Sequence, residues 1–402
     1  MKFLLRYIVF FLYLSNIHFL FLPEKLRTRI LVGIIGLIYY VIKFKGKDIY
    51  KVRLPITFIY PLALSMLLSI IINMSDQLWF LQYVIQQIIL IFGAVYVIHI
   101  TRINKFTTLL WYFLIYIIIQ DTFAFVSLLI PRIWDVIGLM VDKGVSESTE
   151  LEIESQFRAF GFGDFHLFGG GVWVAFGLLS LTFLYKCKEI ASIMYVLLFV
   201  YLLITGLFVA RTALTGLIAI SVLLIPFRKS WYKIIVWAIW GGVFLLILNQ
   251  QQEMLEENGI STGYAFEIFD KFSETGEIQS NSFNATNEMW KTIPKEIDTW
   301  IFGDAKYMDE NGGYYMGVDV GYLRIIFYGG LIGLFFYLLY MVKLASLAYK
   351  RSGGDRILKQ FLLLYLILVF VWLWKGHYDT NCILYLILFS STYRQLLATK
   401  RL

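Results

Sequence analysis

Long apolar runs separated by short polar connections make up most of the chain. Runs of about 17–25 apolar residues are long enough to cross a bilayer as helices. About twelve such spans are predicted, at Tyr7–Leu22, Arg29–Ile42, Leu54–Ile72, Leu78–Ile100, Thr107–Ile130, His166–Tyr185, Ile190–Ala210, Thr212–Phe227, Trp231–Leu248, Gly321–Val342, Ile357–Trp374 and Cys382–Leu397. The pattern predicts an all-α polytopic membrane protein that forms a single membrane domain over residues 1–402.

Two polar stretches interrupt this pattern and are expected to be loops that carry short helices. Residues 131–165 contain three basic and seven acidic residues, and residues 251–320 contain four basic and fourteen acidic ones. In the second stretch, Phe283, Trp290, Ile293, Ile297 and Trp300 recur at helical spacing around Pro294. This spacing indicates a kinked amphipathic helix, which either lies at the membrane interface or packs onto the bundle.

The distribution of charge orients the chain in the membrane. The formal net charge is +7, but the two loops together carry −14, so the remainder carries +21. Cytoplasmic loops of membrane proteins are enriched in Lys and Arg. Counting spans from the C-terminus places the basic connections on one side, at 43–53, 102–105, 186–188, 228–233, 343–359 and 394–401. Both termini are therefore predicted to be cytoplasmic and both acidic loops to lie on the outer side of the membrane. The connection 23–29, with Lys25, Arg27 and Arg29, disagrees with this count.

Composition excludes several classes of protein. Hydrophobic residues make up 59% of the chain and charged residues 16%, which is too apolar for a soluble domain. The basic balance follows from orientation in the membrane, so no nucleic-acid partner is expected. The chain has no Walker A or dinucleotide-binding glycine motif, and its two cysteines and four histidines have no metal-ligand spacing. We expect neither a cofactor nor a bound metal.

Several cations lie near the predicted outer boundary of the membrane, although the outer loops are otherwise acidic. Arg158 precedes the sixth span, Arg211 lies between the seventh and eighth, Arg324 is one turn into the tenth, and Lys375 and His377 lie between the last two. Arginine binds phosphate in a bidentate manner and stays charged. One interpretation is a convergent pocket for a diphosphate. The alternative is that each cation snorkels or neutralises a loop carboxylate, and that His377 is a structural hydrogen-bonding group.

Asp121 is an acidic residue inside the fifth predicted span. An ionisable residue within a membrane segment is usually functional or paired. We expect Asp121 either to have a role in function or to be the counter-ion of one of the arginines. Glycine-rich patches frame the same region at residues 161–171 and 329–333, and close helix packing is the preferred interpretation for the second patch.

Three segments resemble the O-antigen and capsular polysaccharide polymerases of the Wzy type. They are RAFGFGDFHLFGGG at 158–171, ARTALTGL at 210–217 and FGDAKYMDENGGYYMGVDVGYLRIIFYGGLIGL at 302–334. The related O-antigen ligases carry a histidine, a polar residue, nine further residues and then G-x-x-[GTY]. This chain has Asp319 and Val320 there, followed by Gly330 and Gly333, a departure that favours a polymerase.

The resemblance implies a GT-C-like integral-membrane glycosyltransferase fold and metal-independent glycosyl transfer. A growing glycan on undecaprenyl diphosphate would be transferred to a sugar hydroxyl of a new lipid-linked repeat unit, at the periplasmic face of the bacterial inner membrane. The expected partners are these lipid-linked donor and acceptor oligosaccharides, the bilayer itself and a chain-length regulator.

The resemblance and the position of the cations together give the expected site residues. Asp319, Arg211 and Arg324 are the catalytic candidates, with Asp319 as base or sugar-binding carboxylate. The candidates for binding diphosphate or sugar are Arg158, Arg211, Arg324, Lys375, Tyr322 and His377. Alternative functions are an O-antigen ligase, a lipid-linked oligosaccharide flippase or transporter, and a structural subunit of an envelope assembly.

Overall fold

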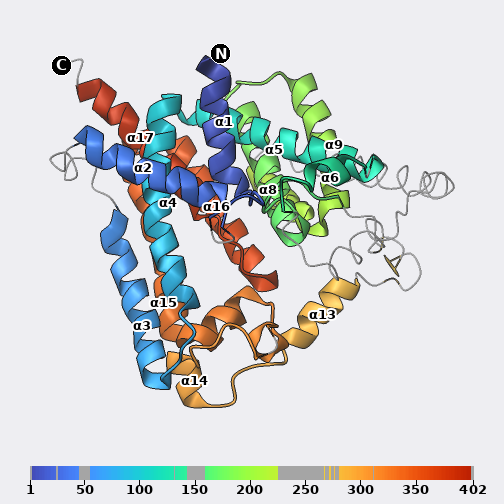
Figure 1. Ribbon diagram of the computed structural model, residues 1–402. Helices are drawn as coiled ribbons and strands as arrows, with labels where there is room; N and C mark the ends of the chain where they lie inside the picture. The colour runs from blue at the N-terminus through green and yellow to red at the C-terminus, as the bar shows by residue number, and fades with distance from the viewer. Residues whose placement is uncertain are drawn as a thin grey trace. The chain divides into compact units, whose positions relative to one another are not determined.

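The computed structural model describes residues 2–23, 26–44, 55–130, 132–142, 159–224, 267, 271–272, 276, 280–310 and 312–399. These residues are almost entirely helical (Figure 1). The longer helices are α1 (Lys2–Ser15), α2 (Thr28–Phe44), α3 (Ile59–Asn73), α4 (Trp79–Thr101), α5 (Phe106–Leu129), α8 (Leu167–Lys186), α9 (Ser192–Val209), α10 (Thr215–Leu224), α15 (Gly321–Arg351), α16 (Arg356–Lys375) and α17 (Asn381–Thr399). Shorter elements are η1 (Pro55–Phe58), α6 (Arg132–Ile137), η2 (Arg211–Leu214), α13 (Asn281–Met289), α14 (Ile297–Phe302) and η3 (Tyr315–Gly317).

Six of these helices, α4, α5, α8, α9, α15 and α16, are long and apolar enough to cross a membrane. By length and composition they are the helices of a polytopic membrane protein, as predicted. Three further apolar helices are shorter, at Leu4–Ser15, Ile59–Asn73 and Asn381–Ser391. The predicted ninth span at Trp231–Leu248 lies outside the described residues, and the total of twelve stays a prediction.

The chain forms two compact units. The first comprises Met1–Tyr112 with Ala285–Leu402, and the second comprises Phe113–Asn284. The prediction of a single membrane domain over residues 1–402 stays a prediction. The loop at 131–165 contains α6, and the loop at 251–320 contains α13, α14 and η3. The expected kinked helix around Pro294 is therefore replaced by two separate helices.

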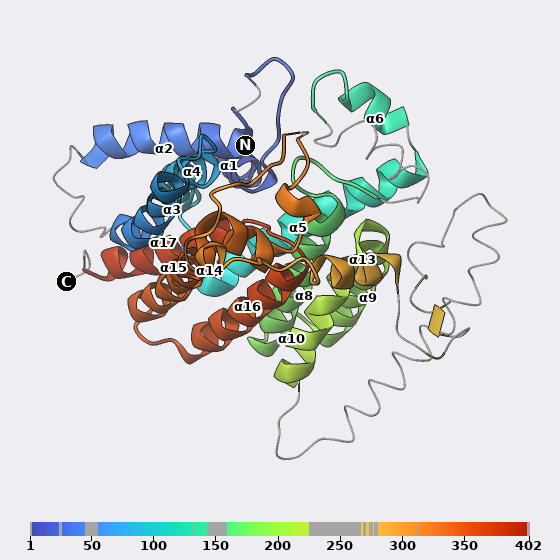
Figure 2. The same cartoon turned by 90° about the horizontal axis from the view of Figure 1, so that it is seen from below.

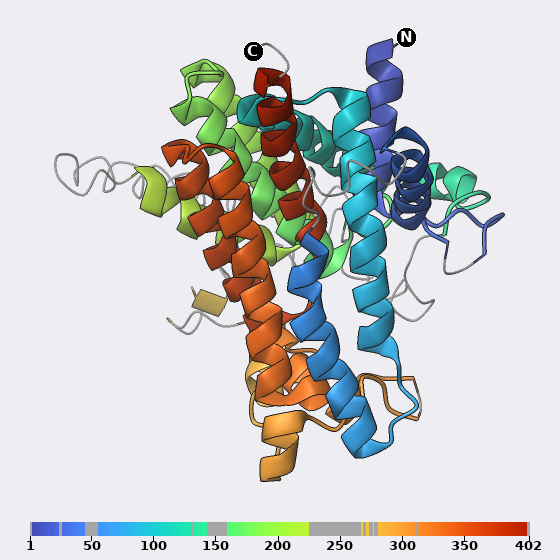
Figure 3. The same cartoon turned by 90° about the vertical axis from the view of Figure 1, so that its left-hand side faces the viewer.

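In the first unit, α3, α4 and α15 run lengthwise beside one another (Figure 3), and α17 packs between α4 and α15. The beginning of α1 and the end of α17 lie at one end of this unit (Figures 1 and 3). The short helix α14 lies at the other end, against α3 and α15. Segments from both halves of the sequence therefore meet at the end remote from the two termini.

The first predicted span, Tyr7–Leu22, is wrong in its limits because α1 ends at Ser15. Asn16 adopts a left-handed conformation with φ of 51°. The guanidinium of Arg29 donates from Nε to the Tyr13 carbonyl at 3.2 Å and from Nη2 to the Leu14 carbonyl at 2.6 Å. A cation that binds the last carbonyls of a helix satisfies groups that would otherwise lack partners. Arg29 is buried as a helix cap, which explains one cation of the connection that disagreed with the charge rule.

The longest helix, α15, is broken at Gly330, where φ is 66° and ψ is −171°. The break leaves the preceding carbonyls available to other partners. The backbone N–H of Asp304 donates to Phe327 O at 2.6 Å, and that of Ala305 donates to Tyr328 O at 3.1 Å. A Cβ atom at Gly330 would clash with the carbonyl of Ile301. The glycine patch of this span, expected to serve helix packing, therefore also holds the loop that follows α14.

In the second unit, α8 packs against α9 and α10 (Figure 2). The side chain of Gln120 in α5 pairs with the backbone of Phe162: its Oε1 accepts from Phe162 N–H at 2.9 Å and its Nε2 donates to Phe162 O at 3.3 Å. The Phe162 ring stacks on Phe123 with centroids 3.9 Å apart. Gln120 therefore anchors the glycine-rich turn that leads into α8.

Gly330→Ala is expected to destabilise the protein by about 2 kcal/mol, because an alanine at this positive φ is strained and its Cβ overlaps backbone. Thermal unfolding in detergent measures the effect. Gly333→Ala is the control, since its Cβ would meet the flexible side chain of Met66 at 3.0 Å. Equal loss in both variants would contradict a special role of the break at Gly330.

Candidate functional site

The loop between α14 and α15 is fixed by side chains at the end of α3 and just after it. Gln77 accepts from the Tyr307 N–H at 2.6 Å through Oε1 and donates to Met308 O at 2.8 Å through Nε2. Ser75 donates to Ala305 O at 2.8 Å, and Asn73 donates to Gly303 O at 2.8 Å. Each of these bonds pairs a side chain with the backbone of the loop, so together they fix the path of the loop backbone.

A tight turn at residues 308–314 brings two tyrosines together. Met308 and Tyr314 form an isolated antiparallel bridge, and the Asp309 carboxylate accepts from the Gly313 N–H at 2.7 Å. Tyr307 also stacks on Trp79, with ring centroids 3.5 Å apart and planes 11° apart. The turn and the Trp79 stack hold the Tyr307 and Tyr314 rings over the beginning of α15.

The Arg324 guanidinium lies on both of these rings. Its Cζ is 4.2 Å from the Tyr307 centroid and 3.8 Å from the Tyr314 centroid, within the range of a cation–π interaction. Its Nη1 donates to Asp319 Oδ1 at 2.9 Å, and only 7% of the side chain is exposed. Its Nε is buried and has no hydrogen-bond partner among the described residues. The guanidinium is fixed in orientation and keeps one unused donor.

Asp319 is the more accessible partner of this pair, with 49% of its side chain exposed. Burial raises the pKa of the Asp319 carboxyl, while the charges of Arg324 and Lys375 lower it. The net effect is a raised pKa, and the access of solvent to half of the side chain limits this rise. Asp319 thus combines access with a higher proton affinity than an ordinary aspartate, which is what a general base needs.

His377 lies in the turn between α16 and α17 and is partly exposed. Its Nε2 is 3.0 Å from Tyr337 Oη, and its ring contacts those of Trp79, Phe80 and Tyr83. Burial and the Arg324 charge lower the pKa of His377 to about 3. The side chain is therefore neutral at physiological pH. It can donate a hydrogen bond through one ring nitrogen and accept one through the other, but it does not add a positive charge.

An aromatic pair and a tyrosine hydrogen bond support the same end of α15. Trp290, which follows α13, stacks on Trp374 of α16 with centroids 4.2 Å apart and donates to the Trp374 carbonyl at 3.3 Å. Tyr322 donates its hydroxyl hydrogen to Phe370 O at 3.0 Å. Gly321 lies so close to Gly376 that a Cβ would overlap its carbonyl. The hydroxyl hydrogen of Tyr322 is thus used in a bond to α16, while the hydroxyl oxygen can still accept a hydrogen bond.

Five of the seven predicted site residues, namely Asp319, Tyr322, Arg324, Lys375 and His377, belong to the first unit. They come from the beginning of α15 and from the connection between α16 and α17. Arg158 lies outside the described residues, and Arg211 belongs to the second unit. The structure therefore brings five candidates to one region, and a pocket formed by all four outer connections stays a prediction.

Arg211 is the first residue of η2 and is buried. It forms an ion pair with Glu267, whose other oxygen accepts from Lys271 at 3.0 Å and from the Asn281 N–H at 2.6 Å. Burial raises the pKa of Glu267, but the hydrogen bonds from Asn281, Arg211 and Lys271 outweigh it and lower the pKa below its ordinary value. A carboxylate of the large acidic loop thus compensates the arginine that has few acidic neighbours in sequence.

Asp121 is fully buried in α5 and accepts a hydrogen bond from Thr205 of α9. Its other oxygen has no hydrogen-bond partner among the described residues. The expectation that Asp121 is the counter-ion of an arginine finds no support in Arg211 and Arg324, which pair with Glu267 and Asp319.

Tyr307, Tyr314, Trp79 and Gln77 complete the surroundings of Arg324 and are absent from the sequence-based candidates. One signal pointed to the tyrosines: the stretch Tyr307-Met-Asp-Glu-Asn-Gly-Gly-Tyr314 has the turn residues of a hairpin flanked by aromatic residues. No local signal connects this stretch to Gln77, which is 230 residues away. No cluster of three or more His, Cys, Asp or Glu suited to a metal occurs in the described part of the chain.

Comparison with known proteins identifies no relative: no family model, no curated protein and no solved structure matches the chain.

The neutral His377 predicts a pH-dependent stability. The unfolded chain binds a proton to this histidine near pH 6.5 and the folded protein only near pH 3, so stability falls as the pH drops from 7 toward 3. Between pH 7.5 and 5 we expect a loss of about 2 kcal/mol from this group, measured as the difference between wild type and His377→Gln in thermal unfolding. Tyr337→Phe keeps the histidine, so its pH dependence should match the wild type. The same slope in all three proteins would contradict the assignment.

Proposed function

We propose that this chain is a polysaccharide polymerase of the Wzy type with a GT-C-like fold of about twelve membrane helices. It transfers a growing glycan from undecaprenyl diphosphate to a sugar hydroxyl of a new lipid-linked repeat unit, at the periplasmic face of the bacterial inner membrane. Both termini are cytoplasmic, and a chain-length regulator is a further partner. The observation that carries the proposal is the Arg324–Asp319 pair beneath Tyr307 and Tyr314 of the loop between α14 and α15.

The proposed reaction needs a base and an anion-binding group next to each other. The acceptor hydroxyl attacks the anomeric carbon of the donor sugar, and the bond from this carbon to the diphosphate oxygen breaks. The hydroxyl proton passes to a base, for which Asp319 is the candidate because half of it is exposed and its pKa is raised. The lipid diphosphate leaves as an anion.

The cations stabilise this leaving group. Negative charge grows on the diphosphate in the transition state, so cations that are already in place favour the transition state over the ground state. The Arg324 guanidinium is held by two rings and a carboxylate and retains a free Nε donor. Lys375 contributes charge close to Asp319. Aromatic rings and a few fixed polar groups are typical linings of binding sites, and no metal is needed for these steps.

Arg324→Lys is the sharpest test of this arrangement. Lysine keeps the charge but can neither stack on both tyrosines as a plane nor bind in a bidentate manner, so polymerisation should fall at least about 100-fold. The measurement is polysaccharide length on a gel, in a deletion strain complemented at equal protein levels. Lys291→Gln is the control. This exposed loop cation pairs with Glu288 at 2.5 Å and does not contact Arg324 or Asp319.

The products distinguish the alternative functions. A polymerase defect leaves single repeat units attached to the lipid A core wherever the strain has a ligase. A complete absence of attached repeats would instead indicate a ligase or a flippase. Full-length chains in Arg324→Lys would refute the proposed role of Arg324.

The Arg211–Glu267 ion pair allows a separate test of the diphosphate interpretation. If Arg211 binds the diphosphate, Arg211→Ala should abolish long chains and Arg211→Ala/Glu267→Ala should remain equally defective. If Arg211 serves only to neutralise Glu267, the double variant should recover polymerisation, because it leaves no buried charge unpaired. Chain length at equal protein levels is the measurement.

A further inference from the structure

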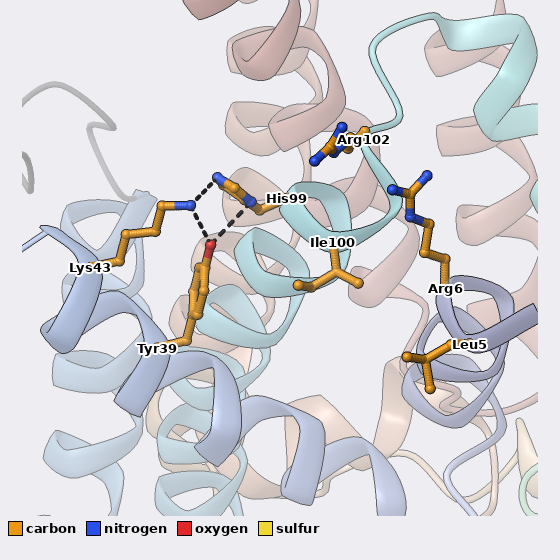
Figure 4. A pocket seen from close by; sticks show the side chains of 7 residues that line it. All are labelled: Leu5, Arg6, Tyr39, Lys43, His99, Ile100 and Arg102. Carbon is orange, nitrogen blue, oxygen red and sulfur yellow. Dashed lines mark hydrogen bonds between the residues drawn. The ribbon is translucent and has the colours of Figure 1, made fainter. Parts of the chain in front are cut away.

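A cavity of about 350 Å³ opens among α1, α2 and α4 of the first unit (Figure 4). Its lining consists of Leu5, Arg6, Tyr39, Lys43, His99, Ile100 and Arg102. These residues come from the beginning of α1, the end of α2 and the end of α4. The lining holds three basic residues and no carboxylate, and it lies at the end of α4 opposite to Trp79.

One wall of the cavity is a hydrogen-bonded triad whose donors and acceptors can be assigned. Lys43 Nζ is 2.6 Å from both Tyr39 Oη and His99 Nε2, and Tyr39 Oη is 3.0 Å from His99 Nδ1. An ammonium can only donate, so His99 Nε2 is the acceptor and its Nδ1 carries the hydrogen that goes to Tyr39. Tyr39 Oη then accepts two hydrogen bonds, and its own hydrogen is left for another acceptor.

The other wall carries Arg6 and Arg102, whose side chains lie across from this triad (Figure 4). Neither they nor Lys43 form an ion pair with a carboxylate among the described residues. Three like charges around one cavity repel one another. An anion with several acceptor oxygens would relieve this repulsion and accept from the guanidinium groups, from Lys43 and from Tyr39.

The surface beside the cavity is apolar and exposed. On α1, Leu5 is 62% exposed and Ile8 43%, and on α2, Val41 is 57% exposed and Ile42 69%. In a membrane protein such faces contact acyl chains. A phosphate-binding cavity next to acyl-binding faces matches an amphiphile with an anionic headgroup better than it matches a soluble anion.

We propose that this cavity binds the phosphate headgroup of an anionic phospholipid, with its acyl chains along α1 and α2. Basic pockets between membrane helices are suited to anionic headgroups. The beginning of α1 and the end of α17 lie at one end of the unit (Figures 1 and 3), so the proposed orientation of the termini places this lipid in the cytoplasmic leaflet. The site itself does not depend on the proposed glycosyl transfer.

Native mass spectrometry of the purified full-length protein tests the site. The probes are dioleoylphosphatidylglycerol and, as the zwitterionic comparison, dioleoylphosphatidylcholine, titrated separately. Lys43→Gln/Arg102→Gln should lower phosphatidylglycerol affinity at least tenfold and leave phosphatidylcholine binding unchanged. Tyr39→Phe, which removes one hydroxyl and leaves the three basic residues in place, should lower it about threefold. Lys350→Gln, at an exposed cation of α15 outside the cavity, should bind like the wild type.

Arg102→Asn provides a variant that is expected to fold. Arg102 caps α4 with φ of 58°, and asparagine tolerates this left-handed conformation better than most residues. The phosphatidylglycerol affinity of this variant should still fall several-fold, while its midpoint of thermal unfolding stays at the wild-type value. Equal affinities in the wild type and all cavity variants would overturn the proposal. Displacement of the lipid by inorganic phosphate at the same concentration would also overturn it, because the site would then be one for a soluble anion.

Discussion

The break of α15 at Gly330 is the constraint on which the first unit depends. A continuous helix would use the carbonyls of Phe327 and Tyr328 internally, whereas the break leaves them to the N–H groups of Asp304 and Ala305. Ser69 of α3 also donates to Tyr328 O, at 2.6 Å. A single residue without a side chain thereby connects α3, the loop after α14 and the helix that carries Arg324. Backbone polar groups at membrane depth need such partners, because lipid offers none.

Fixing the loop in this way determines the chemistry at the beginning of α15. Tyr307 lies two residues after Ala305 and is also held by Gln77 and Trp79. The Arg324 guanidinium is consequently confined by two aromatic faces and Asp319, and its charge contributes to keeping His377 neutral. A cation held in this manner undergoes little reorganisation when an anion arrives, which is the property that makes preorganised sites effective.

Much of this arrangement follows from sequence, because it rests on local patterns. Apolar length predicted the membrane helices, and the position of Arg324 one turn into its span is confirmed, since α15 begins at Gly321. The roles of Asp319 and its neighbours come from the family resemblance and the position of the cations, and they stay a prediction. What could not be predicted depends on contacts between distant segments: the Arg29 cap that ends α1 early, Gln77 binding a loop 230 residues away, and Glu267 pairing with Arg211. Each is a polar side chain whose partner is set by tertiary packing, and no periodicity reveals it.

The basic residues of the chain have different roles, depending on whether the chain itself supplies a group that compensates their positive charge. Arg29, Arg211 and Arg324 are buried, and each is matched by carbonyls or by a carboxylate. Arg6, Lys43 and Arg102 surround a cavity that has no carboxylate in its lining. Buried cations without compensation are costly, whereas cations at a cavity near the membrane surface can be compensated by a ligand. Arg29, Arg211 and Arg324 are thus compensated within the chain, whereas for Arg6, Lys43 and Arg102 we propose compensation by an external anion.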